Sequence, residues 1–178
     1  MHTPKPTLNP KPLAGLSELC RLELWWSVVN TASGLEAMHA LRELVVVECP
    51  SMPLGLMLSY FRGLRQLSMI GNHVTSVPMH ITSLSFLEEL EIGDHVISVP
   101  LALSAMTSLT GLVFMGACGG TFTLQTSRLT GLRQLRNFDA MCWQKVEIFG
   151  ALDELKCALP QLVYLHLRSK ETGTISLS

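Results

Sequence analysis

The chain has 178 residues, of which 48% are apolar, and a formal net charge of −1 at pH 7. This length and composition suffice for one globular domain with a sizeable core. A net charge close to zero supplies no basic field for a phosphate backbone, so it argues against a nucleic-acid partner.

The first twelve residues form a polar segment that contains four prolines. This composition is unlike the apolar centre of a signal peptide, and no later apolar run is as long as a membrane span. The five cysteines include no Cys-x-x-Cys pair, and an odd number argues against a complete disulfide framework. We therefore expect a proline-rich segment over residues 1–12 and a cytoplasmic protein without a membrane partner.

The leucines of this chain recur at a nearly constant interval. The leucine that opens each Leu-x-apolar pair follows the previous one after about 22 to 23 residues, a period that indicates a repeat architecture. Only the last step, from Leu135 to Leu165, is clearly longer. Apolar residues also stand three and six positions before each of these leucines. The seven anchoring leucines are Leu22, Leu44, Leu67, Leu90, Leu112, Leu135 and Leu165.

Each Leu-x-apolar pair alternates as a short strand does when one of its faces is buried. After such a strand the chain must turn back inside a narrow coil, where Asn or Cys can satisfy backbone groups that no sheet reaches. Cys49 and Asn72 occupy this position in the second and third repeats. The third and fourth repeats also share the pattern Gly-Asn/Asp-His-Val-x-Ser-Val-Pro, at 71–78 and 93–100.

The pattern Leu-x-x-Leu-x-Leu-x-x-Asn/Cys followed by Val-Pro resembles the leucine-rich-repeat family. The resemblance covers residues 13–178 and implies one α/β domain of about seven repeats. Such a domain is a right-handed solenoid with a parallel sheet on its concave face and turns and short helices on its convex face. Cys49-Pro50 and the repeat length are similar to intracellular plant-type repeats, including those of disease-resistance and Ras-group repeat proteins.

The longer final step, from Leu135 to Leu165, predicts an insertion. Residues 151–158 have leucines at helical spacing and are expected to form a short convex helix. Met141–Gly150 is then either an insertion loop that carries specificity or part of a longer convex helix. Neither end of the chain has a clear polar cap, so we expect either that the chain is part of a longer protein or that a partner or a second copy covers an open end of the solenoid.

Residues that alternate with the inward leucines should point out of the concave face. Several are aromatic or aliphatic, which favours a protein-binding stripe, and acidic residues in its middle favour a basic partner. The alternatives are that the aromatic side chains fold over the repeat ends, or that the register is wrong by one residue. The predicted protein-binding residues are Trp25, Trp26, Glu43, Val45, Val47, Ile70, Glu89, Glu91, Met115, Phe138, Tyr164, His166 and Arg168.

Candidate chemical sites are weak in this sequence. His73 and His95 occupy matching places in neighbouring repeats, but the sequence offers no third metal ligand, so we interpret them as exposed turn residues. No histidine is placed by the sequence beside a cysteine, as a thiol nucleophile requires. We therefore expect no catalytic residues, no metal ligands and no cofactor.

These observations favour a non-enzymatic recognition module that captures a protein on its concave sheet, as the sensing part of a larger signalling or immune-type receptor. An alternative is a structural or cytoskeletal scaffold subunit that assembles through open solenoid ends. A third is a non-catalytic regulator of a phosphatase, a GTPase or a ubiquitin ligase. A repeat fold by itself does not choose among these.

Overall fold

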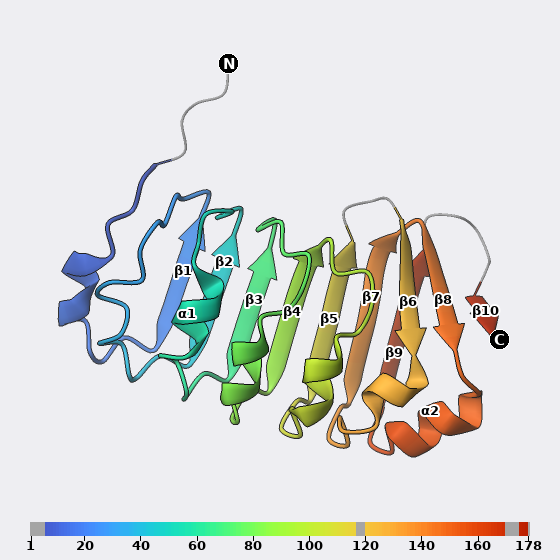
Figure 1. Cartoon of the computed structure of the whole chain (residues 1–178). Helices are drawn as coiled ribbons and strands as arrows, with labels where there is room; N and C mark the ends of the chain where they lie inside the picture. The colour runs from blue at the N-terminus through green and yellow to red at the C-terminus, as the bar shows by residue number, and fades with distance from the viewer. Residues whose placement is uncertain (1–5, 117–119, 170–174, 178) are drawn as a thin grey trace.

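The computed structural model describes residues 6–116, 120–169 and 175–177. The chain winds through seven coils, and each coil contributes one strand to a parallel seven-stranded sheet (Figure 1). This arrangement confirms the expected α/β solenoid. Its strands, in sheet order, are β1 (Arg21–Trp25), β2 (Glu43–Val47), β3 (Gln66–Ile70), β4 (Glu89–Asp94), β5 (Gly111–Gly116), β7 (Asn137–Trp143) and β9 (Tyr164–Ser169).

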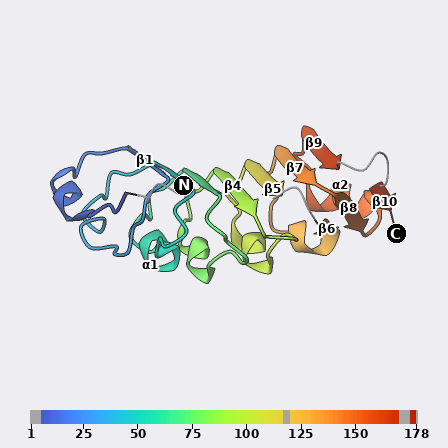
Figure 2. The same ribbon diagram turned by 90° about the horizontal axis from the view of Figure 1, so that it is seen from above.

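The return segments of the coils lie on the other side of the molecule from the exposed face of this sheet (Figure 2). They carry the short helices α1 (Leu54–Leu58), η2 (Met79–Ser83), η3 (Leu101–Ala105), η4 (Thr126–Leu129) and α2 (Leu152–Ala158), whereas η1 (Lys11–Gly15) precedes β1. Helix α2 confirms the prediction for residues 151–158. A second parallel sheet runs along the last coils and consists of β6 (Thr121–Gln125), β8 (Lys145–Phe149) and β10 (Ile175–Leu177).

In β2–β5 the residues of each Leu-x-apolar pair are buried and the residue between them is not, as the sequence predicts. Leu67, Leu90 and Leu112 lie at paired positions of neighbouring strands and are at most 2% exposed. Burying a leucine side chain contributes about 1.5–3 kcal/mol, so the stacked rows of leucines supply the main stabilisation of the sheet. Because the side-chain period is two, the residues between these leucines must face outward.

The sixth strand does not have the predicted register. Phe138, rather than Leu135, pairs with Leu112 on β5 and with Leu165 on β9. The coil from 112 to 138 and the coil from 138 to 165 are therefore both longer than the leucine period, and no single long step separates the last two strands. The reason is that the series of apolar residues three apart is longer than three. Leu135 is its third member and Phe138 its fourth.

The segment Met141–Gly150 is neither an insertion loop nor part of a helix. Strand β7 continues as far as Trp143, and β8 begins at Lys145. We call the coils from 112 to 138 and from 138 to 165, together with the last coil, the wide coils, and the preceding ones the narrow coils. The additional residues of the wide coils extend the strand pairing in both sheets. The two alternatives from the sequence for this segment are wrong, because a period of two along 145–149 was not recognised as a second strand.

Aromatic rings fill the interior of the wide coils. The Phe114 and Phe122 ring centroids are 5.0 Å apart, and those of Phe122 and Trp143 are 5.3 Å apart. The Phe138 ring centroid lies 6.1 Å from that of Phe114. Gly116 allows the Trp143 ring to approach its strand, because a Cβ atom there would lie 2.6 Å from a ring carbon. Large rings thus occupy the volume that the longer coils enclose.

Asn72 and Cys49 satisfy backbone groups inside the turn after the strand, as their positions predict. The Asn72 side-chain oxygen accepts from the Cys49 backbone N–H at 2.7 Å, and its amide nitrogen donates to the Val46 carbonyl at 2.7 Å. The Cys49 sulfur accepts from the Ser27 backbone N–H at 3.4 Å. Buried polar backbone would otherwise be left without partners in this narrow coil.

The described part of the N-terminal segment contacts the first coil. The Leu8 N–H donates to the Val28 carbonyl, and the Val28 N–H donates to the Pro6 carbonyl, both at 2.9 Å. Gly34, with a φ of 99°, passes so close to Pro10 that a Cβ atom would lie 2.7 Å from the Pro10 oxygen. The division of the chain at residue 12 remains a prediction.

Candidate protein-binding groove on the sheet

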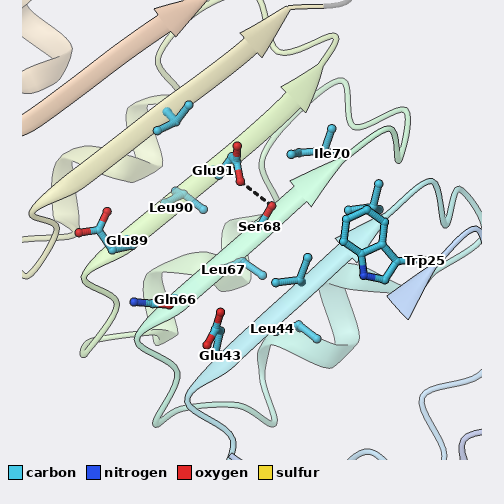
Figure 3. A pocket seen from close by; sticks show the side chains of 13 residues that line it. Trp25, Glu43, Leu44, Gln66, Leu67, Ser68, Ile70, Glu89, Leu90 and Glu91 are labelled. Atoms are coloured by element: carbon cyan, nitrogen blue, oxygen red, sulfur yellow. Dashed lines mark hydrogen bonds between the residues drawn. The ribbon is translucent and has the colours of Figure 1, made fainter. Parts of the chain in front are cut away.

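An open groove of about 540 Å³ crosses β1–β5 on the exposed face of the seven-stranded sheet (Figure 3). We call it the sheet groove. Its lining comes from residues that alternate outward along the strands, with the inward leucines forming the floor between them. The lining residues are Trp25, Glu43, Leu44, Val45, Val47, Gln66, Leu67, Ser68, Ile70, Glu89, Leu90, Glu91 and Val113.

Parallel pairing in register arranges the outward side chains in three rows that run across the strands. The apolar row consists of Trp25, Val47, Ile70, Gly93 and Met115. The middle row consists of Glu23, Val45, Ser68, Glu91 and Val113. The polar row consists of Arg21, Glu43, Gln66, Glu89 and Gly111. Figure 3 shows Trp25 and Ile70 on one edge of the groove and Glu43, Gln66 and Glu89 on the other.

Trp25 stands at the N-terminal end of the groove and is held in place from two sides. Its indole N–H donates to Glu23 at 3.0 Å, and its ring centroid lies 5.5 Å from that of Trp26. Trp25 remains 45% exposed and Trp26 56% exposed, so these rings do not fold into the core. An exposed aromatic ring with a fixed orientation loses little conformational entropy on binding, which suits it to anchor a partner.

Arg21 organises the carboxylates beside this tryptophan. Its guanidinium donates to Glu23 at 2.5 Å and forms an ion pair with Glu43 at 2.5 Å. Hydrogen bonding from Arg21, and next from the Trp25 indole, holds the pKa of Glu23 below its ordinary value. The Glu23 hydrogen bond in turn raises the pKa of Arg21. The acceptor for Trp25 therefore remains ionised into the acidic range.

Glu89 and Glu91 place negative charge in the part of the groove formed by β4. Ser68 donates to Glu91 at 2.7 Å (Figure 3), and Thr110 donates to Glu89 at 3.2 Å. The Glu89 carboxylate lies over Gly111, where a Cβ atom would collide with it. Among the described residues neither glutamate has an ion-pair partner, so neutral hydroxyl groups orient both charges without cancelling them.

Most residues predicted to bind a protein lie on this face, but not all lie in the groove. The groove contains Trp25, Glu43, Val45, Val47, Ile70, Glu89 and Glu91. Trp26 stands beside it, and Met115 continues its apolar row on β5. Tyr164, His166 and Arg168 belong to β9, beyond β7 at the far edge of the sheet.

Phe138 is the predicted binding residue whose placement is wrong. It is completely buried and pairs with the inward leucines of β5 and β9. The cause is the register of the sixth coil, in which the strand begins one three-residue step later than expected. A change in register by an odd number of residues exchanges the inward and outward sets.

Because of the same difference in register, an acidic residue of the sheet face was not predicted from the sequence. Asp139 occupies the middle row on β7, and its carboxylate lies 3.2 Å from His166 Nδ1 on β9. Tyr164 flanks this pair, with its ring centroid 6.0 Å from that of His166. The alternation Phe138-x-Ala140, read as the Leu-x-apolar pair, would have placed Asp139 correctly.

His73 and His95 are both exposed, and their rings stack with centroids 5.8 Å apart and an interplanar angle of 13°. Among the side chains that the structure describes, no group of three or more His, Cys, Asp or Glu residues could hold a metal ion. The repeat places the same turn residue in successive coils, which accounts for the stacking of the two rings.

Comparisons with known proteins identify the fold. An internalin (inlF) from Listeria monocytogenes has a TM-score of 0.70 at 20% identity, over 94% of this chain and 45% of that chain. Internalin C2 (inlC2) from the same organism has a TM-score of 0.66 at 17% identity, over 97% of this chain and 76% of that chain. The Arabidopsis receptor kinase HAESA, in complex with the peptide hormone IDA and the co-receptor SERK1, has a TM-score of 0.53 at 18% identity, over 95% of this chain and 32% of that chain.

The chain therefore has the leucine-rich-repeat fold. It spans less than half the length of the inlF structure. No protein-family model and no curated protein matches the sequence. None of the helices that the structure describes has the length and apolar character needed to cross a bilayer.

Proposed function

We propose that this protein is a recognition module that binds a protein partner in the sheet groove. The observation that carries the proposal is the combination of the exposed Trp25, partly exposed apolar side chains and carboxylates without an ion-pair partner among the described residues, all on one hydrogen-bonded sheet. Trp25 is 45% exposed at one end, and Glu89 and Glu91 stand on β4 three strands away. Interfaces favour buried aromatic anchors with a polar surround.

The structural neighbours support a protein as the kind of partner. The HAESA structure contains a peptide hormone and a co-receptor, so the same fold supports binding of protein partners in that case. A non-catalytic role, a cytoplasmic location and membership of a larger signalling or immune-type receptor belong to the proposal as well. The identity of the partner would follow from its capture.

Site-specific photo-crosslinking tests the proposal. A benzophenone amino acid replaces the exposed Gln66 in the groove in one protein, and Met79 on η2, which is 72% exposed, in another. Both proteins are irradiated in lysate of the source organism. We expect a discrete adduct from position 66 and none of the same mass from position 79.

Two double variants establish whether the adduct depends on the groove. Trp25→Ala with Ile70→Ser removes apolar contacts from the groove, whereas Met79→Ala with Leu101→Ser removes exposed apolar side chains from the helical side. The first pair should abolish the position-66 adduct, and the second should leave it unchanged. An adduct from position 79 alone, or one insensitive to the groove variant, would contradict the proposal.

A further inference from the structure

We infer that the occupant of the sheet groove is an amphipathic helix of the partner that lies across strands β1–β5, with its apolar face on the apolar row and a basic flank over Glu89 and Glu91. This inference rests on the proposed function and adds the conformation and charge of the bound segment. Three features of the groove carry it: the spacing of its rows, its width and the placement of its charges.

The spacing of the strands favours a helix over an extended segment. Neighbouring strands lie about 4.8 Å apart, so the members of one row repeat at that interval. One turn of an α-helix rises about 5.4 Å, whereas side chains on one face of an extended segment are about 6.4–6.8 Å apart. A helix that crosses the strands therefore presents nearly one turn to each coil, because its rise per turn differs from the strand spacing by only about 0.6 Å. The side-chain spacing of an extended segment differs from the strand spacing by more, so its side chains lose register with the coils.

The width of the groove matches the same occupant. The apolar row and the polar row lie at opposite ends of each strand, as Trp25 and Arg21 do on β1. The rise over this part of a strand is about 13 Å, which is close to the diameter of about 10–12 Å of a helix with its side chains. A helix on the middle row would reach both edges at once. An extended segment would reach only one of them.

The two edges differ in chemistry, which requires an amphipathic partner. Trp25, Val47 and Ile70 offer apolar contact on one edge. The opposite edge carries Glu43, which Arg21 pairs, and Glu89, for which the described residues supply a hydroxyl donor and no cation. Because Glu89 and Glu91 share β4, the uncompensated charge is concentrated at one point along the groove. A lysine or arginine on the flank of the helix would meet it.

The positions along the partner follow from the spacing. Strand β4 lies three strands from β1 in the sheet. This separation of about 14 Å corresponds to nearly ten residues of helix at about 1.5 Å per residue. The apolar residue that contacts Trp25 and the basic residue that contacts Glu91 should therefore be separated by about ten residues.

Fluorescence anisotropy with synthetic probes tests this inference on the full chain. The first probe is a labelled peptide of about 18 residues, five turns of helix, with leucines three and four apart and lysines on one flank. The second has the same composition with leucine and lysine alternating, which favours an extended conformation. We expect the helical pattern to bind at least about tenfold more tightly and to gain helical circular dichroism on binding.

Charge reversal separates groove binding from general attraction to an acidic protein. Glu89→Lys with Glu91→Lys should weaken the helical probe at least about tenfold. Asp153→Lys with Glu18→Lys makes the same change in net charge at exposed positions outside the groove, and should alter the affinity less than about twofold. Equal losses in both double variants would overturn the assignment of the basic flank.

The outcomes also distinguish this inference from the function on which it rests. Equal or tighter binding of the alternating probe, with the same dependence on Glu89 and Glu91, would replace the helix with an extended segment. The same replacement would follow if the photo-crosslinked partner contacted the groove through a segment without helix. In both cases the groove would remain the binding site. If neither probe depended on the groove and position 66 gave no adduct, the proposed function itself would fail.

Discussion

The first four coils and the last three differ in size. The inward leucines of β1 to β5 follow the regular period, whereas the steps from Leu112 to Phe138 and from Phe138 to Leu165 are longer. The narrow coils close with short helices and extended turns, and their interiors are mainly aliphatic, with Phe61 as a buried aromatic ring. The wide coils add the second sheet and bury Phe122, Phe138 and Trp143.

We expect the two regions to contribute differently to binding and to stability. The sheet groove lies over β1–β5, where the outward rows combine Trp25 with the β4 carboxylates. The aromatic interior lies in the wide coils, where a larger cross-section must be filled to normal packing density. We therefore expect substitutions of aromatic residues in the wide coils to affect folding, and substitutions of Trp25 in the narrow coils to affect binding.

Phe138→Ala should produce the largest effect. It would leave a cavity among Phe114 and the neighbouring strands and lower the free energy of unfolding by about 3–5 kcal/mol, measured by urea denaturation. Phe86→Ala is the matched control, because Phe86 is 60% exposed, and should change stability by less than about 0.5 kcal/mol. Similarly small losses in the free energy of unfolding for both variants would indicate that Phe138 is exposed and would contradict the register of β7.

Asn72→Ala should have the next largest effect, and it probes the narrow coils. It would leave the Cys49 N–H and the Val46 carbonyl buried without partners, at a cost of about 2–4 kcal/mol in the same denaturation experiment. Asn72→Asp can still accept from the Cys49 N–H, but it cannot donate to the Val46 carbonyl when it is ionised. When its carboxyl group is protonated it can do both, so its loss of stability should then be smaller than that of Asn72→Ala. Equal stability of wild type and Asn72→Ala would show that water replaces these bonds.

Trp25→Ala should change stability little, by less than about 1 kcal/mol, because the ring is 45% exposed and lies at the end of the sheet. Capture of the partner at position 66 should nevertheless fall sharply in this single variant. Thermal melting of the free protein, compared with adduct yield, separates the two quantities. A large loss of stability would place Trp25 with the core residues instead.

The smallest effect concerns the Glu23 carboxylate. Arg21→Met should raise the pKa of Glu23 toward its ordinary value of 4.5, measured by NMR titration, whereas Arg65→Met should not. Since the folded pKa is depressed, the stability that this ion pair contributes is present above the unfolded pKa and is lost as pH falls through the folded one. An unchanged titration midpoint of Glu23 in Arg21→Met would show that Arg21 does not lower the pKa of Glu23.

The regular part of the fold could be predicted because its signal is local and repeated. The leucine period located β1 to β5 and their inward residues, and the Cys49 and Asn72 turns followed from unsatisfied backbone groups. The sixth coil could not be placed this way, since Leu135 and Phe138 both continue a three-residue series. Choosing between them requires the pairing of β7 with β5, which is a long-range contact.

The residues of the exposed sheet face were predicted better than the groove within it. Alternation along a strand decides which side chains point outward, so Val45, Ile70 and Glu91 were assigned correctly to the sheet face. Alternation does not decide which of the outward residues line the sheet groove. That depends on how neighbouring side chains pack, as when the Glu89 carboxylate lies over Gly111.

The most direct test of this division compares two positions in the same row of the sheet. Gln66 on β3 lies in the groove, and Tyr164 on β9 lies outside it, although parallel pairing connects them through one row. With the benzophenone amino acid at each position in turn, we predict a partner adduct from position 66 and none from position 164. Adducts from position 164 alone would place recognition on the wide coils and contradict the account.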